Sequence, residues 1–230
     1  MDAPDLAGPA HRRALQALGR ANVVSRTVAA LWPAIRATAA DAPGPALRIL
    51  ELACGGGHVA VGLARRAMQA GLRIDIEACD LSPVALDYGR QLAARAGVSG
   101  IRFRLLDALR DPLPANADVV VCSLFLHHLA DAEAVALLQR MRLAARRLIL
   151  VSDLRRSALG YLFTTVGCRL LSASTVFHVD GVRSVEGAFT TAEAQTLADR
   201  AGLTGASLTE RWPQRFLLSW RPEACAVGDR

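Results

Sequence analysis

The sequence predicts an α/β fold, a mostly parallel sheet with helices on both faces that ends in an antiparallel hairpin. Between residues 47 and 152, short apolar runs alternate with helix-like segments, which is typical of parallel strands joined by helices. Near the C-terminus, two strand-like runs are separated only by Trp212-Pro213-Gln214. A parallel pair would need a long crossover, so this short connection indicates an antiparallel pair.

The individual elements follow from the hydrophobic pattern. Short apolar runs predict strands at 47–53, 73–79, 101–106, 117–122, 148–152, 206–211 and 215–220. Longer amphipathic runs predict helices at 11–40, 58–70, 83–96, 131–145 and 191–202, with Pro33 near the end of the first. Together these elements predict a seven-stranded sheet.

The chain divides into a main domain and flanking parts, because Ala42-Pro43-Gly44-Pro45 interrupts the helical pattern. The predicted parts are a helical cap at 1–45, a main domain at 46–222 and a tail at 223–230. Residues 154–190 form an insertion whose apolar stretch, 159–177, contains Arg169 and several Ser, Thr and Gly residues. This composition favours a packed helical lid beside a substrate pocket over a membrane span.

Composition limits the classes of partner and location. With 230 residues, 52% of them hydrophobic, the chain is long enough for one well-packed domain. All 27 basic residues are arginine and the net charge is +6, but the arginine pairs are dispersed, so no nucleic-acid partner is expected. The five cysteines form no C-x-x-C pair or zinc spacing, and no signal peptide opens the chain, so the expected location is the cytoplasm.

A glycine-rich turn directly follows the first predicted strand. The apolar run 49–53 contains the acid Glu51 and leads into Cys54 and the glycines at 55–57, with a helix-like pattern after them. Nucleotide-type ligands bind over such a turn, because glycine turns sharply and lets a ligand approach the backbone. Asp80, at the end of the next strand, could accept hydrogen bonds from a ribose hydroxyl pair.

These features alone fit either NAD or S-adenosylmethionine, and three observations favour the second. Glu51 could meet the ammonium group of a methionine moiety, and Asp107 ends the third strand, where it could meet an adenine amino group. The C-terminal hairpin is foreign to most nicotinamide folds. A chain without lysine also cannot carry the Tyr-x-x-x-Lys pair of short-chain dehydrogenases.

Four motifs in order, Glu51-x-Ala53-Cys54-Gly55-x-Gly57, Asp80-Leu81-Ser82-Pro83, Asp107 and Ala117–Ser123, resemble those of class I S-adenosylmethionine-dependent methyltransferases over residues 46–222. The resemblance implies a Rossmann-like fold. It also implies that the glycine turn with Glu51 holds the methionine part, Asp80 the ribose, and Asp107 with its neighbours the adenine. The predicted cofactor residues are Glu51, Ala53, Gly55, Gly56, Gly57, Asp80, Leu81, Asp107, Ala108 and Ser123. The alternative role for Asp80 and Asp107 is helix N-capping.

On the reacting side, His127 and His128 follow the fourth strand. Adjacent helical residues point about 100° apart, so at most one of them is expected to face the substrate. The segment resembles the corresponding motif of quinone-biosynthesis methyltransferases, which favours His128 as the catalytic residue. The alternative is a histidine that packs the helix against the sheet.

His178 and Arg183 form a second polar cluster at the end of the insertion. They could activate a hydroxyl or clamp an anionic oxygen, and the alternative is a solvated loop held by local hydrogen bonds. The stretch 178–190 is similar to bacterial methyltransferases of phenolic polyketide and lipid pathways, which suggests the class of acceptor.

The sequence therefore predicts a methyltransferase that uses no metal and acts on a small hydrophobic acceptor, most readily at a phenol or enol oxygen. A histidine base suits this reaction, because a phenol with a pKa of about 10 gains from deprotonation. Carbon methylation of an aromatic or quinone ring stays open. So do a nicotinamide oxidoreductase and a catalytically silent cofactor-binding partner, whereas the oligomeric state is not indicated.

Overall fold

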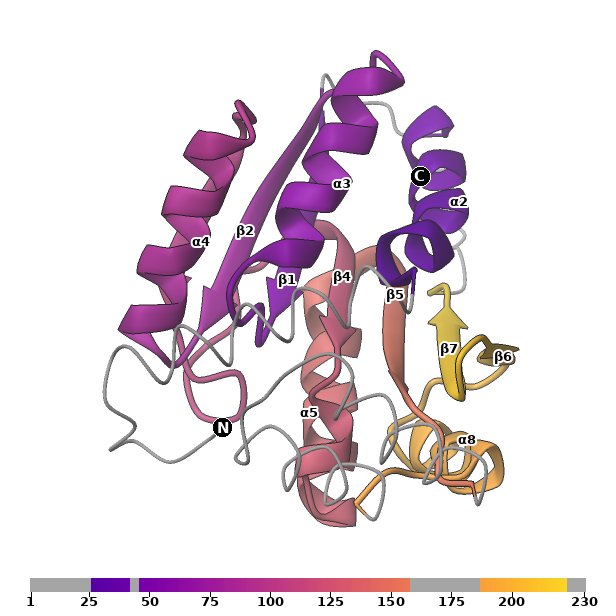
Figure 1. Cartoon of the computed structure of the whole chain (residues 1–230). Coiled ribbons are helices and arrows are strands. Elements are labelled where there is room, and N and C mark those ends of the chain that lie inside the picture. Colours follow the sequence, from indigo (N-terminus) through magenta and orange to yellow (C-terminus); the bar gives the residue numbers. More distant parts are fainter. Residues whose placement is uncertain (1–25, 42–45, 158–186, 223–230) are drawn as a thin grey trace, which may run out of the picture.

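The computed structural model describes residues 26–41, 46–157 and 187–222, and in these the sheet has seven strands in the order β3-β2-β1-β4-β5-β7-β6 (Figure 1). The strands are β1 (Leu47–Leu52), β2 (Ile74–Asp80), β3 (Ile101–Leu105), β4 (Ala117–Ser123), β5 (Ala145–Leu154), β6 (Ser207–Arg211) and β7 (Arg215–Trp220). β1 to β5 pair in parallel, while β7 runs antiparallel to both β5 and β6. The predicted mostly parallel sheet with a C-terminal hairpin is confirmed.

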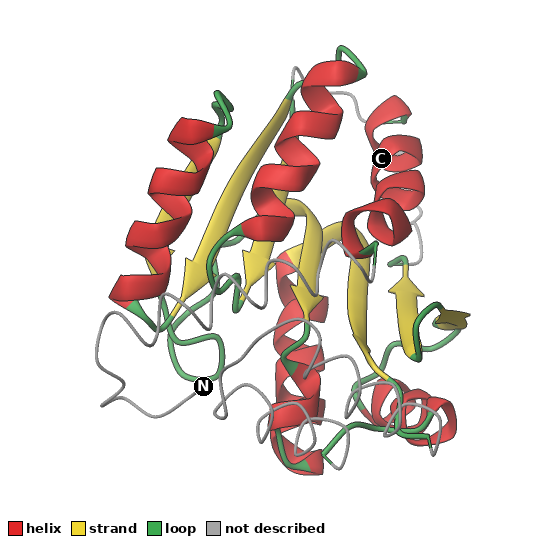
Figure 2. Ribbon diagram, in the orientation of Figure 1, coloured by secondary structure: helices red, strands yellow, loops and turns green. Residues whose placement is uncertain are grey.

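Helices cover both faces of this sheet (Figure 2). In the described ranges they are α2 (Thr27–Ala40), α3 (His58–Gln69), α4 (Pro83–Arg95), α5 (Asp131–Ala144) and α8 (Thr191–Arg200), with a short 3-10 turn, η1 (Leu126–His128). α2, α3 and α4 pack on one face, and α5 and α8 pack on the other. The Rossmann-like architecture predicted from the alternation of elements is present.

The central strands are apolar on both sides because each side faces a helical layer. On β4, Val119 and Val121 join the core under α2 and α3, whereas Val120 and Cys122 join the core under α5 and α8. All four side chains are fully buried. This two-sided burial explains why the central strands read as continuous apolar runs in the sequence.

Local capping residues set the helix starts near the site. The Ser82 hydroxyl accepts a hydrogen bond of 3.2 Å from the Ala85 amide and caps α4, and Pro83 follows at the first helical position. Thr190 and Glu193 form a reciprocal capping box at the start of α8.

The first helix ends at Ala40, as predicted, with the exposed Pro33 inside α2, whereas one strand differs from the sequence prediction. β5 begins at Ala145, directly after α5, and is three residues longer at its start than the apolar pattern indicated. The residues that extend it, Arg146 and Arg147, lie on the outer part of the strand, where charged side chains reach solvent.

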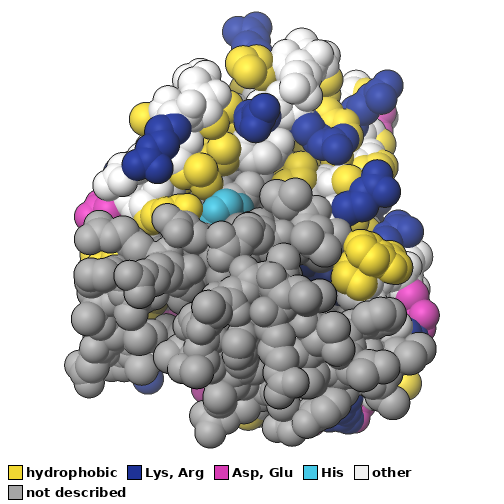
Figure 3. Space-filling view, in the orientation of Figure 1, with side chains coloured by type: hydrophobic (Ala, Val, Ile, Leu, Met, Phe, Trp, Pro, Cys, Tyr) yellow, Lys and Arg dark blue, Asp and Glu magenta, His cyan; other side chains and the backbone are white. Residues whose placement is uncertain are grey.

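Several predicted parts lie wholly or partly outside the described residues, and their boundaries stay predictions. These are the first part of the N-terminal cap, most of the insertion at 154–190 with its apolar stretch, and the tail at 223–230. In the ranges that are described, no helix is long and apolar enough to cross a membrane. Figure 3 shows arginine side chains spread over the visible described surface rather than gathered into one patch.

Candidate active site

The candidate site lies at the carboxyl edge of the sheet, where β1 is flanked by β2 on one side and β4 on the other. Leu52, at the end of β1, is in register with Cys79 of β2 and Cys122 of β4. The Cys54 amide then donates a 2.9 Å hydrogen bond to the Cys79 carbonyl, which carries the chain into the glycine turn. Ligands of open α/β sheets bind at this kind of strand-order reversal.

The glycine turn is bare backbone because side chains cannot be accommodated there. Gly57 has a φ of 70°, and a Cβ at this position would lie 2.7 Å from Phe103 Cε1. A Cβ on Gly56 would lie 2.9 Å from the Tyr88 ring. Gly55 also has a positive φ, of 52°. The turn therefore requires glycine because of its positive φ angles and close packing, and the Gly57 amide donates a 2.9 Å hydrogen bond to the Cys54 carbonyl.

Asp80 braces this turn from the neighbouring strand. Its Oδ2 accepts a 2.7 Å hydrogen bond from the Gly55 amide, and its Oδ1 accepts one of 2.8 Å from the Ser82 amide. Ser82, not Asp80, caps α4. The carboxylate thus holds the end of β2 and the glycine turn together.

Glu51 is the unusual group of the site. Its side chain is 1% exposed, and neither carboxylate oxygen has a hydrogen-bond partner of normal geometry among the described residues. Burial raises the pKa of Glu51 to about 8, the nearby Ala60 amide opposes this rise, and the charge of Asp80 adds to it. A buried carboxylate without partners lacks a cation or donors, and the ammonium group of a methionine moiety would supply both.

The third part of the predicted cofactor site is an apolar ledge at the ends of β2 and β3. Leu81 and Leu105 are 67% and 60% exposed, which is unusual for leucines beside a buried sheet. Asp107 Oδ1 accepts a 2.8 Å hydrogen bond from the Leu109 amide, so this carboxylate shapes its own loop, and Ala108 is buried beside it. A flat apolar group with polar edges could pack against the exposed side chains of Leu81 and Leu105.

For two of the predicted cofactor residues, Ala53 and Ser123, the structure shows a backbone conformation and a buried position. Ala53 adopts a φ of 51°, a left-handed conformation that only the turn requires of it. Ser123 is buried at the end of β4, in register with Ser152 of β5. Ligand contact by these two residues, and by the rest of the predicted set, stays a prediction.

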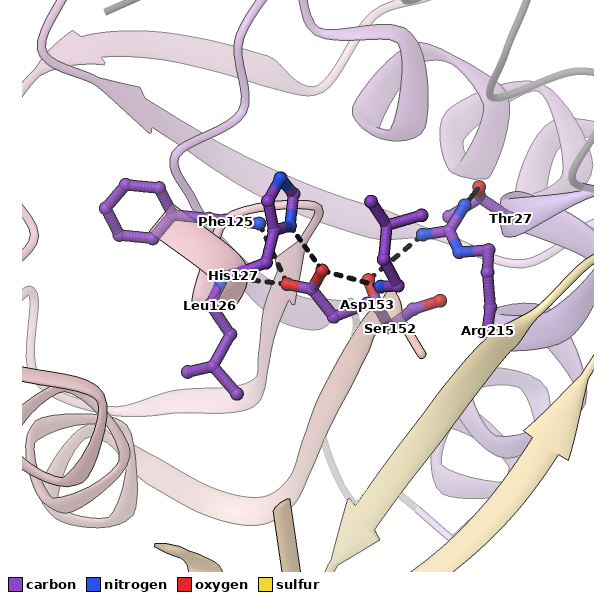
Figure 4. A network of polar contacts seen from close by, with 8 residues as sticks. Thr27, Phe125, Leu126, His127, Ser152, Asp153 and Arg215 are labelled. Atoms are coloured by element: carbon purple, nitrogen blue, oxygen red, sulfur yellow. Dashed lines mark hydrogen bonds and ion pairs between the residues drawn. The ribbon is translucent and has the colours of Figure 1, made fainter. Parts of the chain in front are cut away.

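A buried histidine–carboxylate pair joins η1, which follows β4, to the end of β5. His127 Nδ1 is 2.5 Å from Asp153 Oδ1, and the other carboxylate oxygen accepts hydrogen bonds of 3.0 and 2.7 Å from the amides of Phe125 and Leu126 (Figure 4). The Leu154 amide donates to Oδ1 at 2.6 Å. Burial tends to raise the pKa of Asp153, but the charge and hydrogen bond of His127 and the amides outweigh it, so this pKa is lowered.

Because an ionised carboxylate only accepts hydrogen bonds, the Asp153 contact places a proton on His127 Nδ1. Nε2 is the other ring nitrogen, and Figure 4 shows it on the side of the ring away from Asp153. The same arrangement of carboxylate, imidazole and outward nitrogen orients general bases in many enzymes.

Arg215 completes the network from the hairpin. It is 2% exposed, and its two terminal nitrogens donate to the Thr27 hydroxyl at 2.7 Å and to the Ser152 carbonyl at 3.0 Å. Burial lowers the pKa of Arg215 to about 10, and the charge of Asp153 opposes this change. The guanidinium is thus a buried positive charge that links α2, β5 and β7.

Sequence reasoning missed His127, Asp153, Arg215 and Thr27 as a unit. Asp153 was noticeable as an acid directly after an apolar strand, and Arg215 as a charge that opens one. Their pairing was not visible, because 62 positions separate them along the chain. The antiparallel pairing of β5 with β7 sets Arg215 opposite Leu154, from where its guanidinium reaches the Ser152 carbonyl.

His128, the histidine favoured by the sequence, is exposed, and its ring centroid lies 4.0 Å from that of His127. Its catalytic role stays a prediction. His58 follows the glycines at the start of α3 and packs against Tyr88 with ring centroids 5.6 Å apart, and burial lowers its pKa. His178 and Arg183 lie outside the described residues. Among those that are described, no group of three or more His, Cys, Asp or Glu side chains could hold a metal.

Comparison with known proteins identifies the family. A methyltransferase domain model matches residues 49–147. The ubiquinone biosynthesis O-methyltransferase of Xanthomonas campestris pv. campestris (strain B100) is 30% identical over 194 residues, which cover 80% of this chain and 77% of that protein. The chain belongs to the class I S-adenosylmethionine-dependent methyltransferases.

Further relatives and solved structures agree with this methyltransferase assignment. The Xylella fastidiosa (strain 9a5c) ubiquinone biosynthesis O-methyltransferase is 26% identical over 191 residues, which cover 79% of this chain and 74% of that protein. Human N-acetylserotonin methyltransferase in complex with S-adenosylmethionine has a similar fold (TM-score 0.66, 18% identity, 96% of this chain and 60% of that one). So does Synechocystis PCC 6803 magnesium protoporphyrin IX methyltransferase with bound S-adenosylhomocysteine (TM-score 0.59, 19% identity, 90% and 84%).

The methyltransferase therefore uses S-adenosylmethionine, and the nicotinamide alternative is excluded. The residues present fit this cofactor, because the buried Glu51 carboxylate has no hydrogen-bond partner among the described residues and the ammonium group of the methionine part would supply one. Bound S-adenosylmethionine supplies a methyl group on a positively charged sulfur, which is an electrophile for an in-line displacement.

Proposed function

We propose that this methyltransferase transfers the methyl group to the oxygen of a phenol or enol on a small hydrophobic acceptor. The observation that carries the proposal is the buried His127–Asp153 pair, which presents an oriented imidazole at the edge of the sheet that also holds the glycine turn. β1 and β4 are adjacent strands, so the two parts of the site are neighbours. The printed names of the relatives, O-methyltransferases of ubiquinone biosynthesis, support oxygen as the methylated atom.

In this proposal His127 is the general base. Nε2 takes the proton of the acceptor hydroxyl, and the resulting oxygen anion forms the new C–O bond with the methyl carbon. The methyl–sulfur bond breaks, and its electron pair stays on sulfur. Asp153 stabilises the imidazolium that forms, because its ionised carboxylate is already bonded to Nδ1. His128, which lies against the His127 ring, is the second candidate for the base.

The proposed cofactor contacts are divided among three groups of residues at the carboxyl edge of the sheet. Glu51 and the glycine turn hold the methionine part, Asp80 holds the ribose, and Leu81 with the Asp107 loop holds the adenine. Exposed leucines, a braced carboxylate and an orphaned carboxylate support this order. Ala53 and Ser123 line the same turns, and Figure 1 places all these turns at the same end of the sheet.

The acceptor pocket is proposed to include the insertion at 154–190, with His178 and Arg183 as groups that contact the acceptor oxygen. The polar character of these two residues in an otherwise apolar insertion supports the proposal. A small hydrophobic acceptor is favoured because that insertion is mostly apolar.

The test is a methyl-transfer assay with S-adenosylmethionine and a panel of phenols, enols and hydroxylated quinols, with the products identified by mass spectrometry and NMR. We expect methyl ethers. The variants His127→Gln and His128→Gln are compared in parallel, and we expect a fall in kcat of about 10²–10⁴-fold for the first and less than about tenfold for the second.

Three results would contradict the proposal in different parts. Methyl groups found on ring carbon would replace O-methylation by C-methylation. Full activity of His127→Gln with loss in His128→Gln would make His128 the base. Tight binding of S-adenosylhomocysteine without methylation of any acceptor in the panel would refute the acceptor class.

A further inference from the structure

The structure assigns Arg140, on α5, the role of a positioning residue for the cofactor: its guanidinium fixes the turn that carries Asp107 and thereby sets how well the protein recognises the adenine amino group. The inference rests on the proposed contact between Asp107 and adenine. The bracing of the turn is a property of the folded chain itself, so it can be measured without any ligand or acceptor.

The first step concerns the turn that follows β3. The Leu109 amide donates a 2.8 Å hydrogen bond to Asp107 Oδ1, and the Asp111 amide donates one of 3.0 Å to the Asp107 carbonyl. In the opposite direction, the Asp107 amide donates a 2.9 Å hydrogen bond to Asp111 Oδ2. These bonds make residues 107–111 one compact turn, which lies at the same end of the sheet as the glycine turn (Figure 1). The position of the Asp107 carboxylate therefore depends on where the whole turn is held.

The second step is that the outer residues of this turn face solvent. Its start is tied to β2 by a 3.0 Å hydrogen bond from the Leu106 amide to the Asp80 carbonyl, and Ala108 is buried. Arg110 and Asp111, by contrast, are exposed. A segment with exposed backbone opens readily unless another element of the fold holds it. The outer half of the turn therefore needs a second anchor.

The third step is that Arg140 supplies this anchor from a different element. It is half-buried on α5, where its neighbours Leu138 and Met141 are fully buried in the core. Its Nε donates a 2.9 Å hydrogen bond to the Ala108 carbonyl, and its Nη2 donates to the Asp111 carbonyl. A planar guanidinium suits two carbonyl acceptors at once, because its donors point in fixed directions. One side chain thus joins two points of the turn to a helix that packs on the sheet.

The fourth step is that Asp107 keeps one carboxylate oxygen available. Oδ1 is used by the Leu109 amide, and no described residue donates a hydrogen bond to Oδ2. Arg110 Nε lies 3.8 Å from Oδ2, which is too long for a hydrogen bond, and the Arg110 side chain is 87% exposed. Oδ2 can accept a hydrogen bond from an amino group, whereas it would repel a carbonyl oxygen in the same place. A turn that is already fixed makes this discrimination stronger, because the ligand does not have to order it.

The first measurement is hydrogen exchange of the Leu109 and Asp111 amides, followed by NMR in the protein without ligand. Arg140→Gln removes the charged fork, and Arg140→Lys keeps the charge but cannot bridge two carbonyls. Arg142→Gln, at an exposed arginine of the same helix, is the matched control. We expect both amides to exchange about tenfold or more faster in Arg140→Gln, with a smaller change in Arg140→Lys and none in Arg142→Gln.

The second measurement is calorimetric titration with S-adenosylhomocysteine and with its analogue in which oxygen replaces the adenine 6-amino group. In the unmodified protein we expect the amino compound to bind about tenfold or more tightly than the 6-oxo analogue. This ratio of Kd values is expected to fall below about threefold in Asp107→Asn and in Arg140→Gln, and to stay constant in Arg142→Gln. A role of Arg140 in stability alone would weaken both ligands equally and leave the ratio unchanged.

The outcomes separate the inference from the proposed contact on which it rests. No preference for the amino compound in the unmodified protein, or a preference that persists in Asp107→Asn, removes the proposed contact and the inference with it. A preference that is lost in Asp107→Asn but kept in folded Arg140→Gln overturns the inference alone, and so does an equal effect in Arg142→Gln. If Arg140→Gln does not fold, Arg140→Lys decides in its place, and unchanged exchange with an unchanged ratio overturns the inference. Neither measurement uses an acceptor, so both results are independent of the methylated atom.

Discussion

Two buried carboxylates lie at the same edge of the sheet and have opposite environments. Glu51 on β1 and Asp153 on β5 are each 1% exposed. Glu51 has no hydrogen-bond partner of normal geometry among the described residues, and its pKa is raised to about 8. Asp153 accepts from three amides and one imidazole, lies near a guanidinium, and its pKa is lowered.

The comparison shows that the partners of a buried acid, and not burial alone, decide its charge. Asp153 is satisfied by the protein, so it holds other groups in place and is not available to a ligand. Glu51 is left without partners, which costs stability unless a ligand supplies them. The methyltransferase therefore has a fully hydrogen-bonded carboxylate, Asp153, on the proposed catalytic side. On the cofactor side it has Glu51, a carboxylate without hydrogen-bond partners among the described residues.

The largest effect on stability is expected when the hydrogen-bonded carboxylate of Asp153 is removed. Asp153→Ala leaves three amides without an acceptor and removes the partner of His127, so we expect a loss of about 3–5 kcal/mol in the free energy of unfolding, measured with urea. Asp87→Asn, at an exposed ion pair with Arg90, is the control and is expected to cost less than about 1 kcal/mol. Equal losses in the two variants would show that the Asp153 network adds no stability.

Glu51, the carboxylate without hydrogen-bond partners, is expected to affect cofactor binding instead. Glu51→Gln removes the charge that meets the ammonium group, so the Kd for S-adenosylhomocysteine at pH 8 is expected to rise about 10- to 100-fold, measured by calorimetric titration. Glu77→Gln, on the neighbouring strand β2 and paired with Arg104, is the matched control. Equal affinity of the Glu51→Gln and unmodified proteins would place the ammonium group elsewhere.

Glu51 should also make stability depend on pH in a defined direction. The unfolded chain loses this proton near the ordinary value of 4.5, while the native protein keeps it up to about 8. The unfolded state therefore binds fewer protons in this window, and stability falls as pH rises through it. Without ligand, Glu51→Gln is expected to be more stable than the unmodified protein at pH 8, by up to about 5 kcal/mol, and equal to it at pH 4.5. A constant difference at both values would contradict the raised pKa.

The smallest effect is expected at the glycine turn. Gly57→Ala places a methyl group against the Phe103 ring at a positive φ, whereas Gly71→Ala has a similar φ of 66° and no atom within 4 Å of the new Cβ. We expect a loss of about 2–3 kcal/mol for the first and about 1 kcal/mol for the second, measured by thermal unfolding. Equal losses would show that backbone conformation alone, and not the close packing of the turn, requires glycine.

The sequence predicted the fold because the fold depends on local patterns. Each central strand is an apolar run buried on both sides, and the helix starts carry their capping residues, such as Ser82 and Thr190. The glycine turn was also readable, because its backbone conformation requires residues without a Cβ. The predicted end of the first helix at residue 40 agrees with α2, which accommodates the exposed Pro33 in its interior.

Only the tertiary structure shows that His127 is the histidine oriented by a carboxylate. It also shows that Glu51 is the buried acid without hydrogen-bond partners among the described residues. His127 and His128 are adjacent in sequence, and only the position of Asp153 on the next strand gives the first a fixed tautomer. Arg215 reaches the Ser152 carbonyl and the Thr27 hydroxyl, contacts between residues far apart in the chain. The sequence determines the strands, the turn and the family. The charge state of each buried group depends on distances between strands, which no local pattern encodes.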